Sequence, residues 1–247
     1  MLEPKKIALV TGATRGIGLE TVRQLAGHGL KVLLSGRDTA AVIDRVSAMR
    51  AADLDVDPQS LDVTSCESVA AAATEIEQRF GRLDVLVNNA GIRIEEYGKL
   101  PSEQTLAEWR ETFETNLFGP VMVTNAFLPL LRKSPAARIV NVSSLLGSLA
   151  THCDRDSYAY SDKFKSLPGY SSAKSALNSW TVHLAYELRD TRIKVNSAHP
   201  GYTKTDMNEG DGDLDITAGA ATSVRLALLD DNGPTGGFYH FYETVPW

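Results

Sequence analysis

The 247-residue sequence predicts an α/β fold in one domain spanning residues 1–247: a doubly wound parallel sheet of about seven strands with helices on both faces. Short aliphatic runs alternate with longer helical patterns along the chain, as expected for a parallel sheet joined by right-handed crossovers. Most strand-like runs are almost continuously apolar, which is typical of strands that helices cover on both sides. No internal repeat, low-complexity segment or linker divides the chain.

The elements follow one another in a regular order. The expected strands are KIALV (6–10), KVLLSG (31–36), DVDPQSLDV (55–63), LDVLVNNAG (83–91), ARIVNVSS (137–144), IKVNSAHPG (193–201) and GGFYHF (236–241). The expected helices are 18–29, 40–50, 105–133, 170–190 and 216–229. Pro58 lies in the third strand, and a proline is tolerated at the edge of a sheet but not at its centre. We therefore place that strand outermost.

The composition excludes several classes of protein. The 43% hydrophobic and 23% charged residues are ordinary for a soluble globular protein, and the net charge of −6 argues against nucleic-acid or anionic-membrane partners. No run approaches a membrane span, and MLEPKKIALV carries no signal-peptide pattern. Cys66 and Cys153 are expected to be reduced. His152 and His183 have no ligand-like partners, so no metal site is expected. These features predict a cytoplasmic protein.

The first strand runs into TGATRGIG (11–18) and then into a helix. Gly12 permits a tight turn, while Gly16 and Gly18 let the backbone approach a pyrophosphate. The helix N-terminus offers free N–H groups and a favourable dipole to the phosphates. The spacing is G-x-x-x-G-x-G rather than the commoner G-x-G-x-x-G. Placed after the first strand of an alternating pattern, the turn predicts a dinucleotide site in a Rossmann-type fold.

The end of the second strand indicates which dinucleotide binds. An acidic residue there would accept hydrogen bonds from a free ribose 2′-OH and favour NAD. This strand instead ends LLSGRD, with Arg37 near the expected ribose and Arg15 inside the glycine turn. Two guanidinium groups can hold a 2′-phosphate, which favours NADP(H). Two alternatives stay open: both arginines are solvated surface residues, or Asp38 pairs with Arg37 or faces the ribose itself.

Tyr170 and Lys174 open a helical pattern just after a Pro-Gly break. Residues four apart meet on one helix face, so a surface pair formed by geometry alone is the simplest interpretation. The other motifs of the chain change that interpretation. Six of them resemble, in order, those of the short-chain dehydrogenase/reductase family, and SGRD with HPGYTKTDM look most like its carbonyl reductase branch. The six are TGATRGIG, NNAG (88–91), TFETNLFG (112–119), IVNVSS (139–144), YSSAK (170–174) and HPGYTKTDM (199–207).

This resemblance implies a catalytic tetrad of Asn116, Ser144, Tyr170 and Lys174. Ser144 matches the family serine better than Ser143, because it precedes the hydrophobic pair of SSLLG; Ser143 is then expected to support a backbone turn. In the family the asparagine bends a helix and holds a water that relays protons to the lysine. The alternative for Asn116 is a polar residue near a helix kink.

The resemblance also implies cofactor contacts. Asp62 and Val63 match the segment that holds the adenine, while Pro200 and Thr203 match the loop that contacts the nicotinamide amide. The other implied contacts come from the glycine turn, the second strand, the loop beneath the adenine ribose and the catalytic pair: Gly12, Thr14, Arg15, Gly16, Ile17, Gly18, Arg37, Asn89, Ala90, Gly91, Tyr170 and Lys174.

The implied chemistry explains why a tyrosine and a lysine share one helix turn. Reduction of a carbonyl needs a hydride, which the nicotinamide supplies, and a proton, which the protein supplies. An ammonium roughly 5 Å from the phenol of Tyr170 favours the phenolate by about 3 kcal/mol, or about two pKa units, at an effective dielectric constant of about 20. Lys174 is expected to lower the Tyr170 pKa in this way and to bind the nicotinamide ribose. Ser144 is expected to donate a hydrogen bond to the substrate oxygen.

The predicted function is therefore NADPH-dependent reduction of ketones or aldehydes to alcohols, with Tyr170 as the general acid. Two alternatives are an alcohol dehydrogenase that works mainly in the oxidative direction, and a dinucleotide sensor without turnover. A sugar-nucleotide epimerase also uses a Tyr-x-x-x-Lys pair, but it usually needs a longer C-terminal substrate region.

Two segments depart from the family pattern. Ser144 and Tyr170 lie 26 positions apart, about twice the usual gap, which places an insertion near 147–169. Monomeric carbonyl reductases carry a longer insertion there, so we expect a monomer, and aromatic residues of the insertion either line a pocket rim or anchor the insertion: Tyr158, Tyr160 and Phe164. The acidic, glycine-rich segment near 204–216 is expected to be a substrate lid. Trp247 could pack on the core, approach the pocket or meet a second subunit.

Overall fold

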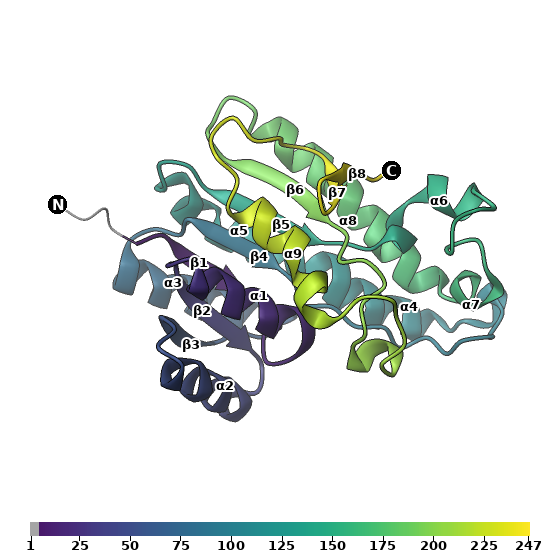
Figure 1. The fold of residues 1–247 in the computed structure, drawn as a ribbon, viewed down its shortest axis with the longest axis horizontal. Coiled ribbons are helices and arrows are strands. Elements are labelled where there is room, and N and C mark those ends of the chain that lie inside the picture. The colour runs from purple at the N-terminus through teal and green to yellow at the C-terminus, as the bar shows by residue number, and fades with distance from the viewer. Residues whose placement is uncertain (1–4) are drawn as a thin grey trace.

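The computed structural model describes residues 5–247. Residues 1–4, which belong to the predicted domain and to the N-terminal stretch without a signal-peptide pattern, lie outside the described part. Within it, a sheet of eight strands has the order β3-β2-β1-β4-β5-β6-β7-β8 (Figure 1). The strands are β1 (Ile7–Val10), β2 (Lys31–Gly36), β3 (Val56–Ser60), β4 (Val85–Asn88), β5 (Arg138–Val142), β6 (Lys194–Ala198), β7 (Phe238–His240) and β8 (Glu243–Thr244).

The doubly wound parallel sheet predicted from the sequence is confirmed. Every pair from β3 to β7 is parallel, with Leu9 of β1 opposite Leu33 of β2 and Leu86 of β4. The predicted seven strands are present, and the two-residue β8 adds an antiparallel eighth. Pro58 lies on the edge strand β3, as expected. The order of the strands reverses between β1 and β4, and ligands of such sheets bind outside the carboxyl ends of the strands at that point.

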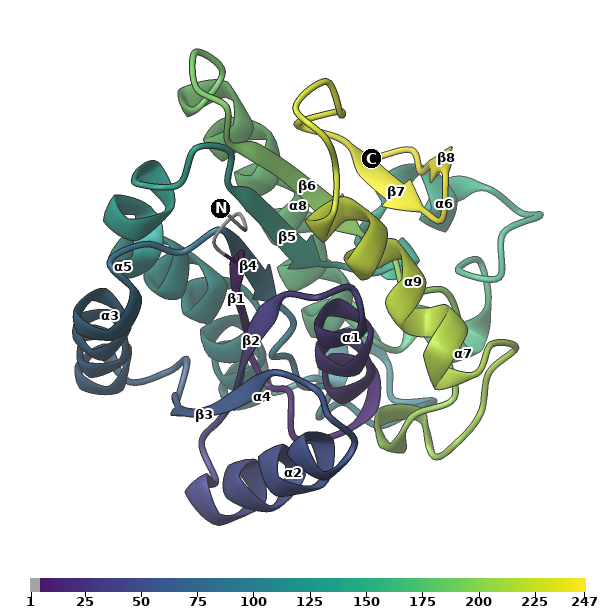
Figure 2. The same cartoon turned by 60° about the vertical axis from the view of Figure 1, so that its left-hand side comes forward.

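Helices cover both faces of the sheet (Figure 2). Leu9 points into the core shared with α3, α5 and α8, whereas its neighbours Ala8 and Val10 point into the core shared with α1, α2 and α9. This alternation follows from the two-residue period of a strand. The helices are α1 (Gly16–Gly27), α2 (Thr39–Ala51), α3 (Cys66–Phe80), α4 (Leu106–Phe113), α5 (Gly119–Arg132), α6 (Leu149–Cys153), α7 (Asp162–Lys165), α8 (Pro168–Glu187) and α9 (Ile216–Ala227).

Helix α3 was not among the predicted helices, although residues typical of a helix start and a helix end flank it in the sequence. The Ser65 side chain accepts a hydrogen bond from the Ser68 N–H at 3.2 Å and caps the first turn. Gly81 ends the helix with φ at 70°, in the left-handed region that glycine adopts easily. Val69, Ala72 and Ile76, on one face, are buried.

The pattern expected to form one helix over 105–133 is divided in two. Helix α4 leads into the π-helical turn η2 (Glu114–Phe118), and α5 follows directly. Asn116 lies in the middle of this turn and is fully buried. A π-helical turn widens the backbone ladder and is frequent at functional sites. The interruption expected at Asn116 is therefore confirmed.

Short elements close the molecule above the carboxyl ends of the strands. The 3₁₀ turn η3 (Leu145–Gly147) leads into the segment 147–169, which carries α6 and α7. The turn η4 (Asp206–Asn208) lies in the segment 204–216, which we call the lid segment. A β-bridge between Thr203 and Leu214 joins its two ends. The Trp247 ring stacks on Phe238 of β7 at 5.6 Å, so of the three alternatives for this residue the structure supports packing on the core. Within residues 5–247 no helix is both long and apolar enough to cross a bilayer.

Candidate active site

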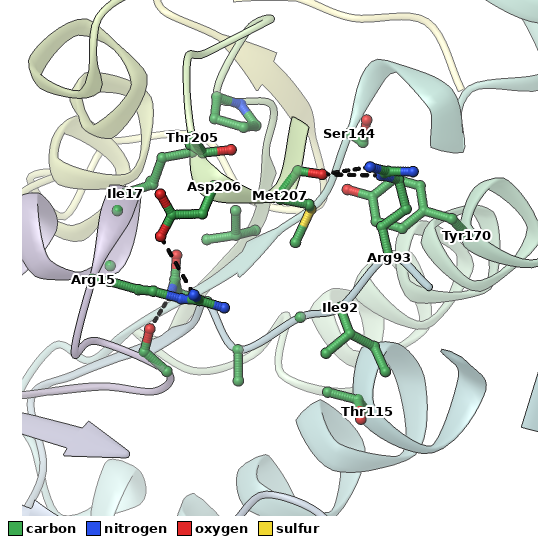
Figure 3. Close-up of a pocket in the computed structure, with 18 of the residues that line it drawn as sticks. Arg15, Ile17, Ile92, Arg93, Thr115, Ser144, Tyr170, Thr205, Asp206 and Met207 are labelled. Carbon is green, nitrogen blue, oxygen red and sulfur yellow. Dashed lines mark hydrogen bonds and ion pairs between the residues drawn. The ribbon is translucent and has the colours of Figure 1, made fainter. Parts of the chain in front are cut away.

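A cavity of about 580 Å³ opens along the carboxyl ends of the strands. The loops that follow β1 to β6 line it, together with the first turns of α8 and part of the lid segment (Figure 3). Every site residue predicted from the sequence borders this cavity, with the single exception of Asn116. The sheet therefore brings together residues from position 12 to position 203 of the chain.

The glycine turn lies tightly against the loop that follows β4. Gly12 has φ at 61°, and a Cβ placed on it would lie 2.7 Å from the Ala90 Cα. A Cβ on Gly18 would collide with the Asn89 amide, which donates to the Thr11 carbonyl at 2.9 Å. No side chain caps the N-terminus of α1, so its first N–H groups face the cavity. Such a cradle fits the pyrophosphate of a dinucleotide.

Beyond the turn, Arg37, Asp62 and Val63 border one end of the cavity. One oxygen of the Asp38 carboxylate accepts a hydrogen bond from the Ala41 N–H at 3.0 Å and caps α2, and among residues 5–247 Asp38 forms no ion pair with Arg37. The alternative that Asp38 pairs with Arg37 is therefore not seen, while the alternative that it faces a ribose stays a prediction, since Asp38 borders the cavity. The Asp62 carboxylate accepts from the N–H and hydroxyl of Thr64 at 2.9 and 2.7 Å, and these hydrogen bonds lower its pKa.

The Arg15 side chain lies over the cavity and contacts the lid segment. Its guanidinium forms an ion pair with Asp206 at 3.3 Å, and both side chains are about three-quarters exposed, at 77% and 75%. Both Arg15 and Arg37 border the same cavity.

Asn116 holds the loop after β4 through two hydrogen bonds to Ile92. Its side-chain oxygen accepts from the Ile92 N–H and its amide donates to the Ile92 carbonyl, both at 2.8 Å. A Cβ on Gly91 would lie 3.3 Å from that oxygen and 3.5 Å from the Lys174 Nζ. The π-helical turn therefore places Asn116 beside the lysine, and Gly91 leaves the space between them.

The two adjacent serines differ in their hydrogen bonds. Ser144 begins the turn η3, where its hydroxyl accepts from the Leu146 N–H at 3.2 Å. The Ser143 hydroxyl is buried and has no hydrogen-bond partner among residues 5–247. The expectation that Ser143 supports a backbone turn is therefore wrong, because Ser144 caps the turn that follows. Both serines border the cavity.

Tyr170 and Lys174 lie one turn apart in α8, with the Lys174 Nζ 5.7 Å from the centre of the Tyr170 ring. The Nζ donates to the Val142 carbonyl at 2.8 Å. Burial lowers the pKa of Lys174 to about 8. Desolvation also raises the pKa of Tyr170 to about 12, against opposing contributions from the Ser144 hydroxyl and the Arg93 charge. The expected net lowering of the Tyr170 pKa is not found in this structure, because desolvation outweighs the charges that favour the phenolate.

Sequence reasoning missed two residues just after the NNAG loop. The Glu95 carboxylate is 2% exposed and accepts hydrogen bonds from the N–H groups of Gly169 and Tyr170, at 2.6 and 2.9 Å. It therefore caps α8 directly at the tyrosine. The Arg93 guanidinium donates to the carbonyls of Met207 and Glu95. The run RIEEYG could have pointed to them, because its charged residues come soon after the buried strand β4, at the carboxyl ends of the strands where sites form.

Aromatic side chains form the far wall of the cavity. Tyr158 stacks on Tyr202 at 5.9 Å, and Phe164 packs edge-on against both at 5.3 and 5.5 Å. Tyr97 joins Phe164 at 6.5 Å. Of the three aromatic residues considered for the pocket rim, Tyr158 and Phe164 border the cavity, whereas Tyr160 lies outside it under the Lys165 ammonium.

The profile of the short chain dehydrogenase family matches residues 6–213. The chain belongs to the short-chain dehydrogenase/reductase family. It is 34% identical to short-chain dehydrogenase/reductase 1 from Saponaria officinalis, over all of this chain and 97% of that protein. Identity to (+)-neomenthol dehydrogenase from Capsicum annuum is 32%, over 97% of each chain.

Solved structures of this family have the same fold. The NADPH-bound carbonyl reductase from chicken fatty liver superposes with a TM-score of 0.84 at 28% identity, covering 98% of this chain and 99% of that one. Salutaridine reductase from Papaver somniferum gives 0.83 at 28% identity, covering 95% and 99%. The short-chain dehydrogenase/reductase architecture thus extends over almost the whole molecule, including the segments that carry the candidate site.

Proposed function

We propose that this protein is an NADP(H)-dependent reductase of ketone or aldehyde carbonyls, with Tyr170 as the general acid. The observation that carries the proposal is the convergence of Ser144, Tyr170 and Lys174 at one end of a cavity whose other end is a glycine-rich nucleotide cradle. The carbonyl reductase with NADPH bound and the reductases among the relatives support the same reaction. Arg15 and Arg37 support a 2′-phosphate on the cofactor.

Each residue has a distinct part in the proposed chemistry. Bound NADPH would supply the hydride to the carbonyl carbon. Tyr170 holds its proton at neutral pH, since its pKa is about 12, and gives that proton to the substrate oxygen. The Ser144 hydroxyl orients that oxygen as charge develops on it. Lys174 would hold the nicotinamide ribose, and Asn116 keeps the loop at Gly91 clear of the lysine.

The aromatic wall indicates the substrate class. Tyr97, Tyr158, Phe164 and Tyr202 present ring faces and edges to the cavity beyond Tyr170. Such a wall favours an apolar substrate with a ring, because aromatic contacts add stabilisation to the burial of apolar area. We propose ketones carried on or beside an alicyclic or aromatic ring.

The replacement Tyr170→Phe tests this function. We expect turnover of ring ketones with NADPH to fall by at least about a thousandfold, because proton transfer and orientation are lost together, while the Kd for NADPH changes less than twofold. The wild-type assay compares NADPH with NADH over ketones and aldehydes, and the reverse assay uses the alcohols with NADP⁺.

Each outcome of these assays has a stated meaning. Comparable turnover by the phenylalanine variant contradicts the proposed acid. Faster turnover with NADH contradicts the roles of Arg15 and Arg37. Cofactor binding without turnover in either direction would favour a dinucleotide sensor.

A further inference from the structure

Arg93 places a positive charge at the catalytic end of the cavity. Its Nε and one terminal nitrogen donate to the Met207 carbonyl at 3.1 and 2.6 Å, and the other terminal nitrogen donates to the Glu95 carbonyl at 2.7 Å. The guanidinium lies 4.4 Å from the centre of the Tyr97 ring. All these acceptors are neutral, and no carboxylate among residues 5–247 forms an ion pair with the guanidinium, although its charge acts on the nearby Glu95 carboxylate. Figure 3 shows it beside Tyr170 and the Met207 carbonyl.

The other groups around Tyr170 either oppose a negative charge on its hydroxyl or favour that charge only over part of the pH range. The Glu95 carboxylate and the phenol of Tyr97 oppose a phenolate there, and the phenol of Tyr158 lies near enough to interact with it. Lys174 favours a phenolate only while it is charged, and its pKa of about 8 means that the charge is lost in the alkaline range. Arginine keeps its charge at every pH an enzyme meets.

We propose that Arg93 supplies the fixed positive charge that stabilises the Tyr170 phenolate during proton transfer. In reduction the O–H bond of Tyr170 breaks, the proton joins the carbonyl oxygen of the substrate, and the electron pair stays on the phenolate. In alcohol oxidation the proton returns to that phenolate. Arg93 acts through Tyr170 and not on the substrate, so it is a positioning residue, and the inference rests on the proposed role of Tyr170.

The same guanidinium couples this charge to the lid segment. Two of its three hydrogen bonds go to the Met207 carbonyl, in the turn η4. A lid held in this position keeps Arg93 beside Tyr170 and shields both from water, which strengthens their interaction. The charge is thus strongest when the lid segment lies over the cavity.

Three substitutions separate charge from packing. Arg93→Gln and Arg93→Met remove the charge, whereas Arg93→Lys keeps it; either neutral variant suffices if the other does not fold. The NADP⁺ complex is used because the positive charge of the oxidised nicotinamide favours the phenolate, so that Tyr170 is expected to titrate below the pKa of about 12 that it has in the structure. In this complex, the phenolate absorbance of Tyr170 is measured from pH 7 to about pH 10.5 by subtracting the matching Tyr170→Phe protein. We expect the neutral variants to shift the phenolate titration about one pKa unit upwards, and the lysine variant to stay within a few tenths of wild type.

The rate profile gives the second readout. The kcat/KM for alcohol oxidation rises with pH as Tyr170 loses its proton, so the rise should move to higher pH by the same amount in the neutral variants alone. The inference is overturned if the neutral variants leave the pH profile unshifted, or if the lysine variant shifts the apparent pKa as much as they do. It is also overturned if the wild-type complex shows no phenolate absorbance. Failure of the proposed function differs, since wild-type turnover itself is then absent.

Discussion

Lys174 is an ammonium group buried at the meeting point of a strand and a helix. Its Nζ has one described hydrogen bond, to the Val142 carbonyl, and its pKa is about 8 because burial disfavours the charged form. Burying this ammonium costs free energy of folding, so Lys174 is expected to be there for function rather than for stability. A group of this kind is expected where a cofactor binds, and its cost should be measurable in the folded protein.

Lys174→Met tests that cost. The folded pKa of about 8 lies below the usual 10.5, so between these values the unfolded chain binds more protons than the folded chain. Stability contributed through Lys174 therefore rises with pH across this window. Relative to the methionine variant, the free energy of unfolding of the wild type should increase by about 2 kcal/mol from pH 7.5 to pH 10. Urea unfolding at several pH values measures it; a constant difference would mean that Lys174 is not desolvated.

At the scale of single elements, helix α8 shows how the tyrosine is fixed. Pro168 is the first residue of the helix, and the preceding residue Leu167 has no side-chain group that caps it. The cap comes instead from Glu95, 74 residues earlier, which accepts from the N–H of Gly169. A Cβ on Gly169 would lie 2.9 Å from the Glu95 carboxylate, so this glycine makes room for the cap. Charge-assisted hydrogen bonds of this kind are strong and directional.

Glu95→Gln should loosen the first turn of α8. An amide can accept through only one atom, so one of the N–H groups of Gly169 and Tyr170 would face an NH₂ group. We expect a loss of about 2 kcal/mol in unfolding free energy and a lower kcat, with the Kd for NADPH nearly unchanged. The exposed neighbour Glu96 provides the control, since Glu96→Gln should alter neither. Equal kcat values in wild type and the Glu95 variant would show that the cap does not position Tyr170.

The elements differ in how far the sequence could predict them. Parallel strands and their order follow from apolar runs and from Pro58, because local composition and the rules of right-handed crossover determine them. Helix α3 was missed although Ser65 and Gly81 mark its ends. The cap on α8 could not be predicted, because it joins Glu95 to a helix that comes close only in the folded chain.

Across the whole molecule, the sequence motifs predicted where the site lies but not the pKa values of its residues. Residues such as Gly12, Ser144 and Tyr170 border one cavity, since the sheet gathers every strand end at one edge. The pKa of Tyr170 depends instead on desolvation by segments far apart in sequence. Arg93 contacts the lid segment, and Asp206 reaches back to the glycine turn. These contacts depend on side-chain directions that a linear pattern does not contain.

The ion pair between Arg15 and Asp206 joins the first and last parts of the site across 191 positions. In the proposed function Arg15 binds the 2′-phosphate of NADPH, so the Asp206 carboxylate competes with that phosphate for the same guanidinium. The pair is exposed, and such pairs are worth roughly 0.2–1 kcal/mol. The competition should therefore be modest, sensitive to salt and absent for NADH, which has no 2′-phosphate.

Asp206→Asn removes the competing charge. We expect the affinity for NADPH to rise about twofold to fivefold at low ionic strength, with a smaller rise at high salt and little change for NADH. Quenching of protein fluorescence measures both Kd values. Asp211→Asn is the matched control, because that lid residue pairs with Lys163 and not with Arg15. If Asp206→Asn leaves the NADPH-to-NADH preference unchanged, or lowers it, then Arg15 does not exchange the lid carboxylate for the cofactor phosphate, and the lid contact has no part in cofactor choice.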